Sequence, residues 1–318
     1  MRLIVDHVTR YVYDQPVRGV VQSHRLTPAR FDGQKVIHWT ITVAGGEMGG
    51  GFRDGAGDWV QGWTVKGPVS TVEVRVQGQV ETTDLAGVLR GHRELVPPLA
   101  YLRSTPATEA DDALRALADS AAQDDPLSHA HALAFAVAGA IAYRPGSTHS
   151  HTTAAEALAQ GEGVCQDHAQ ALIACARHAG FPARYVAGYL FSSEDGTPHE
   201  ASHAWAELHV PGYGWIGFDP ANRCCPDARY IRLGSGYDAQ DAAPLIEVGD
   251  ATEIMHARRG ARRLPADAIE PQAAAHLEQH AVGWIEVDAR REIERHHRDG
   301  LEQRPLAARV TSQHPRVG

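Results

Sequence analysis

A glycine-rich turn leads directly into an apolar-periodic helix in the stretch GEGVCQDHAQALIACARHAG, Gly161 to Gly180. The apolar residues recur at the three- and four-residue spacing of a helix with one buried face, and Gly180 followed by Pro182 predicts its end. Such a helix must bury its face against another layer, so the chain needs a sheet or further helices. Cys165 falls at the first helical position, where free backbone N–H groups and the helix dipole favour a thiolate over a thiol. A lone cysteine is more often a small core residue, so this position alone does not establish chemistry.

The residues after this helix predict the sheet on which it packs. Residues 183–191 (ARYVAGYLF) and 201–210 (ASHAWAELHV) are rich in branched and aromatic residues, and a Pro-Gly-Tyr-Gly turn at 211–214 leads to WIGFDPANR. Before the cysteine helix, capping signals predict three shorter helices: one opened by a capping box at 108–111, one from Pro126 to about Tyr143, and one from Thr153 to Gly161. Helices followed by an antiparallel sheet are typical of an α+β core, which we assign to residues 101–249.

The N-terminal part of the chain has a different texture. VTRYVY, VIHWTITV, DWVQGWTV and VSTVEVRVQGQVE are β-type runs separated by glycine, proline and aspartate. They predict a β-sandwich-like domain over residues 1–100. Residues 250–318 form a polar C-terminal extension that is either disordered or helical, with candidate helices at about 272–282 and 286–298.

Composition excludes several classes of protein. The net charge of −9 argues against nucleic-acid and anionic-membrane surfaces. The N-terminal apolar run is broken by Asp6 and His7, so it does not resemble a signal peptide, and no window is long and apolar enough for a membrane span; we therefore predict a cytoplasmic protein. No CxxC pair is present, and we expect neither a disulfide framework nor a metal or other cofactor from the four cysteines, Cys165, Cys175, Cys224 and Cys225.

Two polar residues in the predicted strands are candidate partners for Cys165. A thiolate that attacks an amide needs a base that later protonates the leaving amine, and His203 lies in an apolar strand where a histidine needs a reason. Asp219, at the end of WIGFDP, is the candidate orienting carboxylate. If the strands pair across a four-residue turn at 211–214 without a bulge, Asp219 falls opposite Ala206. The triad therefore requires a bulge or a shifted turn.

Three motifs in this order, GVCQDHA, FPARYVAGYL and SHAWAELHVPGYGWIGFDPANR, resemble the transglutaminase-like branch of the papain-type cysteine enzymes. The resemblance spans about Pro98 to Leu245, and HVTRYVYDQPV onward resembles the β-rich N-terminal domain of bacterial members. It implies a papain/transglutaminase-like core in which Cys165 is the nucleophile, His203 the base and acid, and Asp219 the orienter.

The resemblance leaves the second oxyanion donor open. The backbone N–H of Cys165 would supply one donor. Eukaryotic members use an upstream tryptophan for the other, and none occurs here between Trp63 and Cys165, so Tyr143 is the candidate substitute. For the remaining polar and aromatic residues of the motifs, we expect capping, packing or surface roles: Asp167, His168, Arg184, Trp205, Trp215 and Arg223.

These observations favour an enzyme that cleaves a protein or peptide amide through a thioester, as a protease or amidase. Water is favoured over an amine as the acyl acceptor, because no amine site is evident. The alternative is a non-catalytic peptide-binding or scaffolding module that retains the cleft, and a partner could bind the N-terminal domain or the C-terminal tail in either case. A third reading, a zinc hydrolase using His149, His151 and His199, has ligand spacings that match no common zinc pattern.

Overall fold

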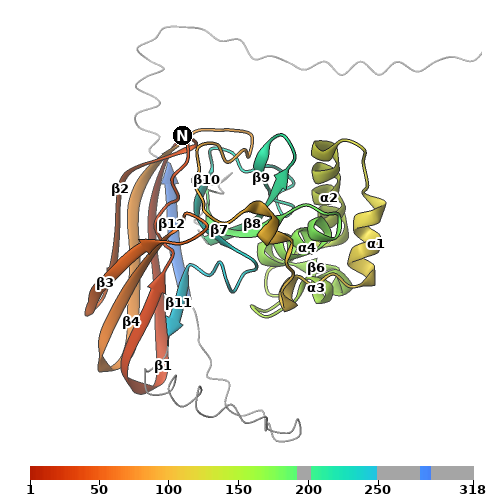
Figure 1. Ribbon diagram of the computed structural model, residues 1–318. Helices are drawn as coiled ribbons and strands as arrows, with labels where there is room; N and C mark the ends of the chain where they lie inside the picture. The colour runs from red at the N-terminus through yellow and green to blue at the C-terminus, as the bar shows by residue number, and fades with distance from the viewer. Residues whose placement is uncertain (192–201, 249–279, 288–318) are drawn as a thin grey trace, which may run out of the picture. The chain divides into compact units, whose positions relative to one another are not determined.

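Two antiparallel sheets and one short parallel pair of strands organise the chain (Figure 1). The computed structural model describes residues 1–191, 202–248 and 280–287, the last without side chains. The first sheet is built mainly from N-terminal residues, and the second from residues that follow the cysteine helix. The four cysteines all carry free thiols. None of the helices in the described residues is long and apolar enough to span a membrane.

The N-terminal sheet has the strand order β11-β1-β4-β2, with β12 paired to β1 and β3 paired to β4. Its strands are β1 (Arg2–His24), β2 (Gln34–Val43), β3 (Gly46–Arg53), β4 (Trp59–Thr82), β11 (Leu245–Val248) and β12 (His280–Val287). The predicted strands DWVQGWTV and VSTVEVRVQGQVE are one continuous strand, β4. β3 was not predicted, because its glycine-rich sequence GEMGGGFR has few of the residues that favour strands.

The second layer of the predicted sandwich comes from the core domain. Alternate residues of β1 and β4 are buried, and they share one hydrophobic cluster with Tyr189, Ile231 and Leu233 of the second sheet. The strand-rich N-terminal region is thus confirmed, but its apolar face is covered by core strands. This packing explains why the N-terminal strands need no second sheet of their own.

The prediction of a helical or disordered C-terminal extension is wrong for residues 280–287. This segment is β12, which pairs antiparallel with β1 from Leu3↔Val287 to Arg10↔His280. Pairing with an available strand edge overrides the weak helical pattern of the sequence. The rest of the two predicted helices, and the remainder of 249–318, lie outside the described residues.

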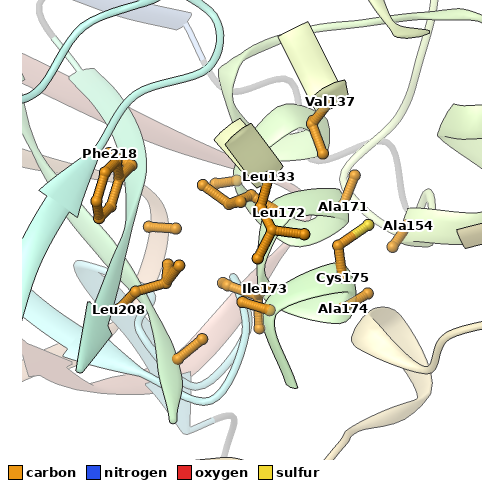
Figure 2. Packing of buried hydrophobic residues seen from close by; sticks show 14 of the residues in the cluster. Leu133, Val137, Ala154, Ala171, Leu172, Ile173, Ala174, Cys175, Leu208 and Phe218 are labelled. Atoms are coloured by element: carbon orange, nitrogen blue, oxygen red, sulfur yellow. The ribbon is translucent and has the colours of Figure 1, made fainter. Parts of the chain in front are cut away.

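The second sheet has the order β10-β7-β8-β9, and every neighbouring pair is antiparallel. Its strands are β7 (Ala183–Leu190), β8 (Ser202–Val210), β9 (Gly214–Phe218) and β10 (Tyr230–Gly236). The cysteine helix α4 (Cys165–His178) packs on β7 and β8. Figure 2 shows this interface, where Leu172 and Ile173 lie among Leu208, Phe218 and residues of the other helices. The predicted α+β core, with a cysteine-bearing helix on an antiparallel sheet, is confirmed.

The shorter helices begin where their side chains cap them. α2 (Pro126–Ala140) follows Asp125, whose carboxylate accepts the Ser128 N–H at 2.8 Å. α3 (Ala154–Gln160) has the predicted capping box at Thr153 and ends at Gly161, whose φ of 68° is left-handed.

α1 (Asp112–Ser120) starts later than predicted. Its cap is Asp111, whose carboxylate accepts the Leu114 N–H at 2.8 Å, whereas Thr108 ends a preceding 3-10 turn, Pro106–Thr108. The reason is local: a carboxylate immediately before the helix caps it directly, so no capping box four residues upstream is needed.

Candidate active site

The hairpin between β8 and β9 sets the position of the candidate triad. Val210 pairs with Gly214 and Ala206 pairs with Phe218, so the turn has three residues, Pro211–Tyr213. The four-residue turn assumed from the sequence is therefore wrong by one residue, and the shifted-turn alternative is the one found. A one-residue shift moves a side chain to the other face of a strand. Asp219, directly after Phe218, thereby lies on the face that carries His203 and Trp205.

His203 and Asp219 form a short hydrogen bond. His203 Nε2 donates to Asp219 Oδ2 at 2.6 Å, and their side chains are 9% and 0% exposed. In register, Asp219 is two residues along from the position opposite His203, and such diagonal neighbours on one face are within reach of long side chains. The geometry requires no bulge in β8 or β9.

Cys165 is held at the start of α4 by the residues on either side of it. A short parallel pair, β5 (Ala142–Tyr143) with β6 (Glu162–Gly163), leads into the helix. Asp167 reaches back so that its Oδ2 accepts the Val164 N–H at 2.7 Å. A side chain at Gly163 would meet Asp167, with Oδ2 at 2.9 Å from an added Cβ, so this position needs glycine. The backbone N–H of Cys165 belongs to the first turn, whose N–H groups have no partner within the helix.

Asp219 and Cys165 both influence the imidazole of His203. Because Nε2 is hydrogen-bonded to Asp219, Nδ1 is the nitrogen that could face the sulfur. Burial alone would lower the pKa of His203, but the influence of Asp219 and Cys165 outweighs it and raises the pKa to about 9. Burial would raise the pKa of Asp219, and the hydrogen bond from His203 with those from Asn222 and Tyr230 lowers it instead. The arrangement favours an imidazolium between a carboxylate and a sulfur.

A polar loop of residues 147–152 is tied to the first two turns of α4. Gln166 Nε2 donates to the Ser150 carbonyl at 3.0 Å, and Gln170 Nε2 donates to the Thr152 carbonyl at 3.0 Å. Thr148 Oγ1 donates to Asp167 Oδ2 at 2.6 Å. These bonds fix the loop beside the first two turns of α4.

Asn222 and Tyr230 contact the candidate triad and were not predicted as site residues. Asn222 Nδ2 donates to Asp219 Oδ2 at 2.7 Å and lies 3.3 Å from His203 Nε2. Tyr230 Oη donates to the same Oδ2 at 2.8 Å. Asn222 lies three residues after an aspartate, which is a turn signal that could have been followed. Tyr230 lies on another strand and could not have been found locally.

The structural interpretations of the neighbouring residues agree with the observed contacts. Asp167 is a cap, and His168 is buried with Nδ1 and Nε2 at 2.9 and 3.0 Å from the carbonyls of Val164 and Ile141. Trp205 lies against His203, with 6.4 Å between ring centroids. Arg223 donates to the Ala138 carbonyl at 2.9 Å.

Arg184 and Trp215 contribute to the interior of the protein. Arg184 is fully buried, so its role is structural, and its guanidinium lies 4.0 Å from the centroid of the Trp215 ring. Trp215 Nε1 donates to Glu94 at 2.6 Å. Tyr143 lies on β5, and its ring centroid is 6.2 Å from that of His168; the second oxyanion donor remains a prediction.

Among the residues that the structure describes, no group of three or more His, Cys, Asp or Glu side chains is arranged to hold a metal ion. His199, part of the zinc alternative, lies outside them.

A hollow of about 530 Å³ lies at the other end of α4, lined by residues that include Leu99, Phe181 and Pro182. At 1.5 Å per residue, that end of the helix is about 20 Å from Cys165, so the hollow does not belong to the triad.

The fold and the site define a protein of the transglutaminase-like class. A model of the transglutaminase-like superfamily matches residues 115–220, and a model of the bacterial transglutaminase-like N-terminal region matches residues 3–81. The chain is 30% identical over 263 residues to the uncharacterized protein ML0607 of Mycobacterium leprae, a match that covers 77% of this chain and 91% of the relative. The chain belongs to the transglutaminase-like superfamily, and its N-terminal region is the one found in bacterial members.

Further similarities extend this relationship. The uncharacterized protein Rv2569c of Mycobacterium tuberculosis is 43% identical over 114 residues, which cover 32% of this chain and 36% of the relative. A solved structure of a candidate cysteine protease from Cytophaga hutchinsonii superposes with a TM-score of 0.61 at 23% identity, covering 79% of this chain and 86% of that one. At this identity the likeness shows a shared fold.

Proposed function

We propose that this protein is a cysteine-dependent amide hydrolase, acting on a protein or peptide, with Cys165, His203 and Asp219 as its catalytic triad. The observation that carries the proposal is the buried 2.6 Å hydrogen bond between His203 and Asp219. Cys165 at the start of α4 acts on the same imidazole and helps to raise its pKa. A nucleophile, a base within hydrogen-bond reach and a third group that orients the base are the arrangement that covalent catalysis needs.

The reaction follows from these positions. The sulfur of Cys165 attacks the amide carbon, and the negative charge that develops on the carbonyl oxygen is stabilised by the backbone N–H of Cys165. The imidazolium of His203 gives its proton to the leaving amine as the C–N bond breaks, which leaves a thioester. His203, now neutral, takes a proton from water as the water attacks the thioester, and the acid and the thiolate are released.

Water is the proposed acyl acceptor because it is always available.

The cytoplasmic location stays a prediction. The fold relationship to a candidate cysteine protease supports a protein or peptide as substrate, because proteases act on such amides.

The first experiment is alkylation of the native protein with iodoacetamide across pH 5.5–9.5, followed by peptide mass spectrometry. The chain supplies two reference thiols: Cys224, which is partly exposed, and Cys175, which is fully buried and whose pKa burial raises to about 12. Because a neighbouring imidazolium stabilises a thiolate, we expect Cys165 at pH 6.5 to react about 10-fold or more faster than Cys224.

The matched variant is His203→Ala, in which Cys165 should lose this advantage while Cys175, whose thiol donates to the Leu114 carbonyl, keeps its rate. If Cys165 reacts no faster than Cys224 in the wild type, the nucleophile assignment fails and the non-catalytic binding module takes its place. If reactivity survives in His203→Ala, the role of His203 is wrong.

A further inference from the structure

Three hydrogen-bond donors converge on a single oxygen atom, Oδ2 of Asp219. They are His203 Nε2 at 2.6 Å, Asn222 Nδ2 at 2.7 Å and Tyr230 Oη at 2.8 Å. The Asp219 side chain has no exposure to solvent, so these donors replace the water that would otherwise disperse its charge. Each donor that shares this oxygen weakens the hold of the carboxylate on the proton of His203.

Tyr230 itself is held by a thiol. Its Oη lies 3.3 Å from Cys224 Sγ. Because the single hydroxyl hydrogen is directed to Asp219, the tyrosine oxygen must accept the thiol hydrogen of Cys224. The backbone of Cys224 is fixed in turn, since the main chains of Asp219 and Cys224 exchange hydrogen bonds of 2.8 and 3.2 Å. The hydrogen bonds therefore form a relay: Cys224 donates to Tyr230, and Tyr230 donates to Asp219.

Packing confines the phenol ring of Tyr230. Tyr230 is 5% exposed, and its ring meets the rings of Trp205 and His203 edge-on, at centroid distances of 5.5 and 5.9 Å. A side chain locked by packing and by a hydrogen bond at its tip fits the role of orienting another group.

We propose that Tyr230, braced by Cys224, is a positioning residue that fixes Asp219 Oδ2 and disperses its charge, so that His203 holds its proton less tightly and can deliver it to the leaving amine. The inference rests on the proposed function for its catalytic meaning. Its structural content, a hydrogen bond that moves the titration of His203, can be measured without a substrate.

The charged and titratable groups that face His203 and Tyr230 come from several elements. His203 faces Cys165 from α4 and Asp219 from the end of β9. Tyr230 faces Asp219, Cys224 and Arg229, whose guanidinium lies 6.0 Å from the centroid of the ring and is paired with Asp227 at 2.8 Å.

Both outer members of the relay keep their hydrogens. Burial raises the pKa of Tyr230, and the charge of Asp219 raises it further. Burial also raises the pKa of Cys224. The phenol and the thiol therefore remain donors over the working pH range.

The test is the titration of the His203 imidazole, followed by NMR in the full chain, in the wild type and in Tyr230→Phe. Without the third donor, Asp219 is a stronger base, so His203 should titrate about 0.5 to 1 pH unit higher. The matched control is Tyr189→Phe: Tyr189 is buried on the adjacent strand β7, and its Oη is 3.0 Å from His7 Nδ1, away from Asp219. It should leave the titration of His203 unchanged. No shift in Tyr230→Phe, or an equal shift in Tyr189→Phe, overturns the proposal.

A second pair of variants keeps the test decisive if Tyr230→Phe does not fold. Cys224→Ala removes the donor to Tyr230 and should shift His203 in the same direction by a smaller amount, whereas Cys225→Ala should not. An unshifted His203 in Cys224→Ala would then count against the relay. The proposed function is tested separately by iodoacetamide alkylation. If Cys165 in the wild type reacts no faster than Cys224, the assignment of Cys165 as the nucleophile is refuted, whatever the titration of His203 shows.

Discussion

Two histidines with buried side chains have pKa values shifted in opposite directions, and the cause lies in their immediate neighbours. His203 is hydrogen-bonded to Asp219, and despite its burial Asp219 and Cys165 together raise its pKa to about 9. His24 on β1 has no exposure, its Nε2 is 3.0 Å from Gln22 Oε1, and burial lowers its pKa to about 4. A neutral partner cannot compensate the loss of hydration of a charged ring.

The lowered pKa of His24 predicts that the folded protein loses stability in acid. The unfolded chain binds a proton at this residue near pH 6.5, whereas the folded protein resists until about pH 4. The stability contributed by neutral His24 is therefore present above pH 6.5 and is lost as the pH falls towards 4, by at most about 3 kcal/mol. Urea unfolding at pH 7 and pH 4.5 should show a smaller loss for His24→Gln than for the wild type.

The exposed His38 on β2 provides the control for this measurement. His38→Gln should lose stability between the two pH values as the wild type does. Equal losses in His24→Gln and the wild type would show that His24 is not the acid-sensitive group.

At the scale of elements, the β8–β9 hairpin decides which face of the sheet presents Asp219. The three-residue turn requires left-handed backbone at Gly212 and Gly214, whose φ angles are 82° and 81°. Glycine adopts this conformation without strain, and a residue with a Cβ does not. The same turn keeps Phe218 on the face that packs against α4 and Asp219 on the opposite face.

Gly214→Ala should destabilise the protein by about 1–2 kcal/mol. An added Cβ meets nothing within 4 Å, so the cost comes from the backbone alone. Gly139 in α2 offers a matched control: its added Cβ also meets nothing, but its backbone is helical. Gly139→Ala should stabilise by about 0.5–1 kcal/mol in the same denaturant titration. Changes of the same sign in both variants would contradict the role assigned to the turn.

At the scale of the whole molecule, buried ions join the N-terminal region to the core. Arg232 on β10 donates to Asp58 Oδ1 at 2.7 Å and to Glu207 Oε1 at 2.9 Å. Glu207 also accepts from Arg184 at 2.7 Å. Burial would raise the pKa of Glu207, but the two arginines outweigh it and lower the pKa to about 2. Asp58, next to β4, also accepts from the N–H and hydroxyl of Ser235 at 2.7 and 2.9 Å.

Removing Asp58 should be costly, because buried Arg232 then keeps Glu207 as its one carboxylate, and the Ser235 N–H and hydroxyl lose their acceptor. We expect Asp58→Ala to lower the free energy of unfolding by about 3–5 kcal/mol, measured by urea denaturation at pH 7. The control is Asp6→Ala, which breaks the exposed pair of Asp6 on β1 with Arg75 on β4 and should change stability far less. Comparable losses in the two variants would show that burial does not set the strength of these pairs.

Much of the local structure could be predicted from neighbouring residues. The start of α4 at Cys165 and the start of α3 after Thr153 depend on contacts within a few positions, and the structure has both. The α+β class followed from the order of these elements. β3, β10, β11 and β12 were not predicted, because these strands form where another strand offers its edge.

The candidate chemical groups could be named from local sequence: a cysteine at a helix start, a histidine in an apolar strand, and an aspartate closing the next strand. How these groups come together depends on the folded chain. The length of one turn set the face on which Asp219 lies, and the distant strand β10 supplied Tyr230 to its carboxylate. Caps and helical periods depend on neighbours in the chain, whereas strand register and buried hydrogen bonds depend on residues that folding alone brings together.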